Sequence, residues 1–115
     1  MKLIKSILFT LLLVTLFTAC SKDDGPNSYQ YEVSGTAGNY SITCEGAPSG
    51  TVQYSNVGNG PVYKWTQTGT RWLYLSAQNN TSNGSVTVKI TKNGTVIAQQ
   101  TSYGAYVIAT VSGTY

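Results

Sequence analysis

The 115-residue sequence is poor in charge: 10% of its residues are charged, with seven Lys or Arg, four Asp or Glu and no histidine. Because the basic residues are scattered, no Lys/Arg cluster exists that could follow a nucleic-acid backbone, so nucleic acid is not an expected partner. The lack of histidine excludes a Ser-His-Asp catalytic triad, and the length suits one small domain.

The first predicted element along the chain is an export signal. Lys2 and Lys5 accompany an unbroken run of apolar residues and threonines from Ile7 to Phe17. As a helix this run would span about 17 Å, well short of the roughly 30 Å hydrocarbon core of a bilayer. A basic start followed by a short apolar stretch is typical of a secretory signal peptide.

The end of this signal, Phe17-Thr18-Ala19-Cys20, resembles a bacterial lipobox, although leucine is more usual at the position of Phe17. The resemblance implies cleavage between Ala19 and Cys20, with Cys20 becoming a lipidated first residue that carries acyl chains such as palmitate. Each buried CH₂ contributes about 0.8 kcal/mol, so more than one chain holds durably in the membrane. The alternative is an ordinary signal peptide with a chance cysteine.

The residues after Cys20, Ser21-Lys22-Asp23-Asp24-Gly25, resemble the short acidic stretch of Bacteroidetes-type lipoproteins. That resemblance implies an outer-membrane lipid anchor, with the protein on the cell surface or on the periplasmic face. A solvated linker would have a similar composition. The expected organisation is a signal peptide (1–19), a lipidated cysteine with a polar linker (20–28) and one folded domain (29–115).

The rest of the chain predicts an antiparallel β-sandwich of seven to eight short strands. Period-two alternation recurs about every ten residues, no helical periodicity is present, and Gly, Asn and Pro fill the intervals. Asn93-Gly94 favours a type I′ turn that joins two strands as a hairpin. The predicted strands are Tyr29–Val33, Tyr40–Cys44, Thr51–Tyr54, Val62–Thr66, Trp72–Ala77, Ser85–Thr91, Thr95–Gln100 and Tyr106–Val111.

The same alternation predicts which side chains form the core. Along Ser85–Thr91 the even-numbered apolar residues should face inward and the odd-numbered polar residues outward. Cys44 shares a face with Tyr40 and Ile42 and has no disulfide partner if Cys20 is lipidated, so it is expected to be a small core residue. Trp65 is also expected in the core, because sandwiches often bury one tryptophan.

Arg71, Trp72 and Tyr74 form the candidate binding surface. Leu73, Leu75 and Ala77 take one face of their strand, which leaves these three residues for the other. Tyrosine and tryptophan combine an apolar face with a polar group, which suits contact with a glycan or with a host protein. The alternative is that the rings serve the fold through cross-strand packing.

No residues are expected to catalyse a reaction or to bind a metal or cofactor. The predicted domain has only two carboxylates, Glu32 and Glu45, and both alternate outward or lie at a strand end. General acid–base catalysis needs two poised groups, and metal sites need clustered ligands. We therefore expect a protein that is not an enzyme.

Residues 31–44 and 72–115 resemble the soluble domain of the MmpS (mycobacterial membrane protein small) family. The shared features are a Tyr-x-Val-x-Gly-x-Ala start, an Ile-Thr strand, Leu-x-Ala-Gln, Val-x-Val-x-Ile and an Asn-Gly hairpin. The resemblance implies an immunoglobulin-like β-sandwich that acts as an accessory or assembly factor of an RND-type membrane transporter. Family members have an N-terminal membrane helix, whereas this chain is expected to have a lipid anchor. The second functional hypothesis is a surface-exposed binding module for a glycan or host protein.

Overall fold

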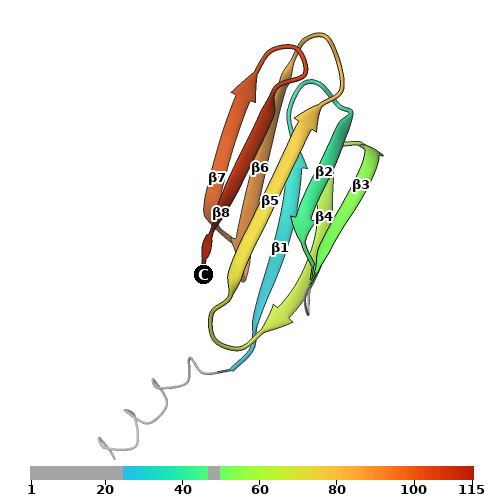
Figure 1. Cartoon of the computed structure of the whole chain (residues 1–115). Coiled ribbons are helices and arrows are strands. Elements are labelled where there is room, and N and C mark those ends of the chain that lie inside the picture. The colour runs from blue at the N-terminus through green and yellow to red at the C-terminus, as the bar shows by residue number, and fades with distance from the viewer. Residues whose placement is uncertain (1–24, 47–49) are drawn as a thin grey trace, which may run out of the picture.

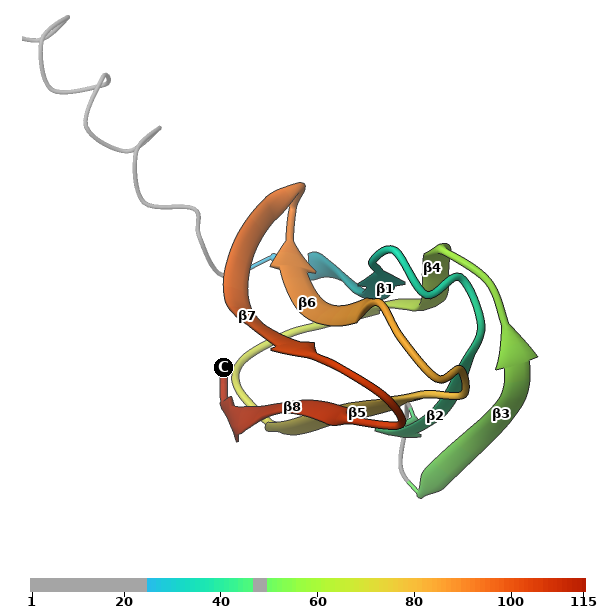
Figure 2. The same cartoon turned by 90° about the horizontal axis from the view of Figure 1, so that it is seen from above.

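The computed structural model describes residues 25–46 and 50–115 as two four-stranded sheets packed face to face (Figures 1 and 2). The predicted signal peptide, its cleavage site and Cys20 lie outside the described residues. Within the described part, no helix is long and apolar enough to cross a membrane. The strands are β1 Asn27–Ser34, β2 Tyr40–Glu45, β3 Thr51–Val57, β4 Gly60–Gln67, β5 Trp72–Asn79, β6 Ser85–Lys92, β7 Thr95–Tyr103 and β8 Ile108–Thr114.

The predicted antiparallel β-sandwich is confirmed. Each of the eight predicted ranges overlaps one observed strand, and every pairing is antiparallel. One sheet has the order β4-β1-β6-β7 and the other β3-β2-β5-β8. In immunoglobulin constant domains the first two strands share a sheet, whereas β1 and β2 lie in opposite sheets here. The likeness to immunoglobulin domains is therefore one of architecture and not of strand order.

The strand order follows from two long hairpins, and each arm of a hairpin crosses from one sheet to the other. In the first hairpin, the arm β1–β2 pairs with the arm β3–β4, β1 with β4 and β2 with β3. In the second, the arm β5–β6 pairs with the arm β7–β8, β5 with β8 and β6 with β7. The hairpins join through β1–β6 and β2–β5. When β1–β4 are matched in order with β5–β8, each sheet corresponds to the other sheet. The fold therefore has an approximate internal twofold symmetry.

All four bends lie at one end of the molecule, which we call the corner end (residues 35–39, 58–59, 80–84 and 104–107; top of Figure 1). Close backbone approach there requires glycine. A Cβ on Gly35 would clash with the Ser85 carbonyl oxygen, and one on Gly84 would lie 2.9 Å from the Ala37 nitrogen. Gly104 N also donates to Gly84 O at 2.8 Å, so the bends support one another. The opposite end, where β1 begins, is called the N-terminal end.

The hairpin turn at Asn93-Gly94 has the predicted conformation. Asn93 and Gly94 have φ values of 51° and 87°, the two positive values that a type I′ turn requires. The Asn93 side chain then joins the turn to the start of β1, because its Oδ1 accepts from Ser28 N at 2.9 Å. This turn therefore lies at the N-terminal end.

The core lies between the sheets and contains the residues that alternation assigned to it. Val86, Val88 and Ile90 are buried, as is the set of Tyr40, Ile42 and Cys44. Trp65 is also buried, which confirms its predicted place. Its ring contacts three tyrosines, with centroid separations of 5.6 Å to Tyr29, 4.7 Å to Tyr31 and 5.7 Å to Tyr63.

Candidate functional site

Trp72 and Tyr74 lie together on the outer face of β5, as the alternation of this strand predicts. Their rings are stacked, with centroids 5.7 Å apart and planes inclined by 20°. Trp72 remains 52% exposed, while Tyr74 is half-buried. The stack holds Trp72 in one orientation and leaves part of its indole surface available for contact with a ligand.

Arg71 does not join this pair. It precedes β5, and its guanidinium donates to the carbonyl oxygen of Gly46, at the end of β2, at 2.9 Å. Its backbone is fixed by two hydrogen bonds with Tyr115, each 3.0 Å long. Of the three residues of the candidate binding surface, the structure brings the two aromatic rings together and directs the Arg71 guanidinium to the backbone that follows β2.

The aromatic pair belongs to a larger surface, which we call the neutral face: the outward side of the sheet β3-β2-β5-β8. Along each of these strands, the less exposed side chains point into the sandwich and the intervening, more exposed ones point outward. Its outward residues are Ser41, Thr43, Glu45, Thr51, Gln53, Ser55, Trp72, Tyr74, Ser76, Gln78, Ile108, Thr110, Ser112 and Thr114. Among them Glu45 carries the single charge, and hydroxyl and amide groups predominate.

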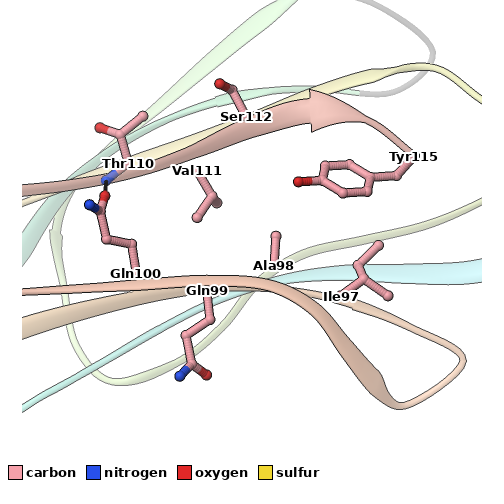
Figure 3. Close-up of a pocket in the computed structure, with 8 residues that line it drawn as sticks. All are labelled: Ile97, Ala98, Gln99, Gln100, Thr110, Val111, Ser112 and Tyr115. Atoms are coloured by element: carbon pink, nitrogen blue, oxygen red, sulfur yellow. Dashed lines mark hydrogen bonds between the residues drawn. The ribbon is translucent and has the colours of Figure 1, made fainter.

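Hydrogen bonds fix several of these polar groups in place. Thr110 Oγ1 donates to Ser76 Oγ at 3.0 Å, and Gln78 Nε2 donates to the carbonyl oxygen of Tyr106 at 3.1 Å. Thr110 N donates to Gln100 Oε1 at 2.9 Å across the gap between β8 and β7 (Figure 3). The neutral face is consequently ordered before any ligand arrives.

At the corner end a second group of exposed apolar side chains adjoins the neutral face. Tyr103, Tyr106 and Ile108 are 78%, 56% and 55% exposed. The prediction began the last strand at Tyr106, but β8 begins at Ile108, and Tyr106, with a φ of 53°, lies in the bend before it. In the sequence, the two tyrosines that flank Gly104-Ala105 are the pattern from which an exposed corner could have been predicted.

The buried Asn79 holds this corner in place. Its Nδ2 donates to the carbonyl oxygens of Asn83 and Gly104, both at 2.9 Å, and its Oδ1 accepts from the backbone and hydroxyl of Thr81. Tyr106 N donates to Thr81 O at 3.1 Å. A fully hydrogen-bonded buried amide specifies one loop conformation, so Tyr106 is held in its left-handed conformation.

Two titratable groups of the core, Cys44 and Tyr31, are held in their protonated forms by burial. Burial raises the pKa of the Cys44 thiol to about 11, with a smaller contribution from Glu45, so the sulfur stays protonated and inert at neutral pH. Burial likewise raises the pKa of Tyr31 to about 12. In residues 25–46 and 50–115, no group of three or more His, Cys, Asp or Glu side chains could hold a metal ion.

A hollow of about 460 Å³ lies between the edge strands β7 and β8 (Figure 3). Ala98 and Ile97 come from β7, Val111 comes from β8, and the ring of Tyr115 lies over the gap between the two strands. The hollow thus marks where the two sheets separate at their shared edge, beside the Thr114 end of β8.

No protein-family model matches this chain, and no curated protein matches it in sequence. The fold and surface alone define its class, which is a small antiparallel β-sandwich with one neutral, aromatic-bearing face.

Proposed function

We propose that this protein is a non-enzymatic, lipid-anchored protein of the bacterial outer membrane whose β-sandwich acts by binding. The observation that carries the proposal is Trp72, a large aromatic residue that is 52% exposed although the core is complete without it. Exposed tryptophans held by a neighbouring ring are typical anchors of binding surfaces. The lipobox-like sequence ending at Cys20 supplies the membrane attachment in this proposal.

The arrangement of the domain is compatible with such an anchor. β1 begins at the N-terminal end, and the corner end lies opposite (Figure 1). A chain tethered at Cys20 would therefore direct the corner end, with Tyr103 and Tyr106, away from the membrane. The neutral face runs between the two ends and would therefore be roughly perpendicular to the membrane plane.

Lipid attachment is tested with the full-length chain in a bacterial host fed a radiolabelled or clickable fatty acid. We expect label on the wild-type protein, and we expect Cys20→Ala to lose both the label and its retention in the membrane fraction. Cys44→Ala is the matched control and should be labelled as the wild type is, because its thiol is buried. Equal label in wild type and Cys20→Ala would contradict the proposed anchor.

A second candidate is an accessory or assembly factor of an RND-type transporter, as the MmpS resemblance over residues 31–44 and 72–115 implies. In this case the exposed aromatic residues would contact the permease or its periplasmic partners. Co-purification of an RND permease of the native organism with the full-length chain, lost on Trp72→Ala, would favour this candidate over ligand capture at the surface.

A further inference from the structure

We propose that the neutral face binds an uncharged polysaccharide chain, which lies along β5 and β8 from Trp72 to Ile108. The inference rests on the proposed function, because it names the ligand class of that same binding surface. It also extends the site predicted from sequence to the opposite end of the sheet, where Ile108 and Tyr106 are exposed.

The distribution of charge selects an uncharged ligand. In the described part of the chain, Glu32, Lys64 and Lys89 project from the opposite sheet, where Glu32 and Lys64 line a separate hollow of about 450 Å³. The neutral face has only Glu45, at its margin, and the described corner-end segments contain no charged residue. Arg71 lies beside the same margin, where its guanidinium already donates to the carbonyl oxygen of Gly46. Between Ser76 and Ile108, an anionic or cationic ligand would therefore lose its hydration without gaining an ion pair.

The side-chain chemistry selects a carbohydrate among uncharged ligands. A sugar ring has an apolar face of C–H groups, which stacks on an aromatic ring, and a rim of hydroxyls, which exchange hydrogen bonds with hydroxyl and amide side chains. Trp72 offers the ring, and Ser76, Gln78 and Ser112 offer the polar groups in line with it. Serine is depleted in protein–protein interfaces, so the centre of this face is a poor match to a protein partner.

The length of the neutral face favours an extended polysaccharide over a single sugar. Trp72 and Gln78 are six residues apart on one strand, and Gln78 pairs directly with Ile108, so the two apolar ends are roughly 20 Å apart. The hydrogen bonds Thr110–Ser76 and Gln78–Tyr106 keep the intervening surface ordered. Such a preformed surface lowers the entropic cost of binding an extended polymer.

The test is affinity electrophoresis of the full-length protein in detergent, through gels that contain one polysaccharide each. The uncharged probes are dextran, amylopectin, laminarin and galactomannan, and the charged probes are alginate and heparin. We expect retardation by at least one uncharged polymer and by neither charged one. Trp72→Ala should weaken the interaction at least tenfold, because stacked aromatic anchors dominate such interfaces.

Two further variants separate loss of binding from loss of folding. Thr43→Arg places a bulky charge in the middle of the neutral face without touching the core, and it should also abolish retardation. Gln30→Ala, on the outer face of the other sheet, should bind as the wild type does. Circular dichroism melting curves of all three variants verify that each is folded at the temperature of the assay.

Retardation by none of the uncharged polymers, by the charged polymers alone, or equally in wild type and Trp72→Ala would overturn the inference. If the protein binds no polysaccharide but co-purifies with a permease through Trp72, the ligand class proposed here is wrong while the lipid-anchored binding function stands. Absence of the fatty-acid label from the wild-type protein would instead contradict the proposed anchor, whatever the gels show.

Discussion

At the scale of single residues, burial decides the chemistry of Cys44 and Tyr31. Both side chains lie in the sandwich without solvent exposure, and an ionised group there loses its hydration. Burial is the main reason that the pKa of the Cys44 thiol rises from 9.0 to about 11 and that of the Tyr31 hydroxyl from 10.0 to about 12. These groups therefore contribute to packing and not to reactivity.

These pKa shifts predict a loss of stability in alkali. Both groups are neutral when protonated and have higher pKa values in the folded state, so their contribution is complete below the unfolded pKa and is lost as the pH rises toward the folded value. The free energy of unfolding should fall from about pH 9 toward pH 12, and Cys44→Ala should remove the part between about 9 and 11. Urea titrations across this range measure the slope.

The matched control for that experiment is Thr43→Ala, which changes the neighbouring outward residue of β2 and should leave the slope as in the wild type. If Cys44→Ala and Thr43→Ala showed the same dependence of stability on pH, the thiol would not be the group responsible.

At the scale of elements, period-two alternation sets the register of each strand. β6 shows this most clearly, because Val86, Val88 and Ile90 are fully buried, and Val88 and Ile90 pair with residues on both β1 and β7. Because a shift by one residue would turn every side chain to the opposite face, the register is strongly specified. The Asn93-Gly94 turn fixes the same register from the end of the strand.

The register predicts that two substitutions to aspartate on β6 destabilise the protein to very different extents. Val88→Asp introduces an unpaired charge into the core, at a cost of several kcal/mol against a total stability of about 5–10 kcal/mol for a domain of this size. This variant should be largely unfolded. Thr91→Asp, which faces outward near Lys64, should cost at most about 1 kcal/mol. Similar melting temperatures of the two variants would contradict the register.

At the scale of the whole molecule, two bent hairpins bring distant segments to one face and one end. The neutral face combines strands from both hairpins, and the corner end combines all four bends. Asn79 on β5 thereby fixes the loop that carries Tyr106, far along the chain. A rigid scaffold that presents exposed aromatic residues is the arrangement that binding proteins commonly use.

The position of Trp72 and Tyr74 predicts that the pair can be removed without unfolding the protein. Since Trp72 is half exposed and both rings lie outside the core, Trp72→Ala with Tyr74→Ala should lower stability by about 1–2 kcal/mol, mostly through the lost stacking. Thermal melting of the full-length chain measures this. Leu73→Ala is the control and should cost about 2–5 kcal/mol, because Leu73 is fully buried. A larger loss in the aromatic double variant than in Leu73→Ala would show that the pair serves the core.

The strands, their inward and outward sides, the Asn93-Gly94 turn and the shared face of Trp72 and Tyr74 could all be predicted from the amino-acid pattern. All of these depend on neighbours within one strand or turn, where alternation and turn chemistry act locally. Three features could be seen only in the folded molecule: the strand order, the hydrogen bond from Arg71 to Gly46 and the conformation of Tyr106. Each of these depends on a partner distant in the sequence, and the pattern of side chains along a strand contains no information about which distant strand or loop will lie beside it.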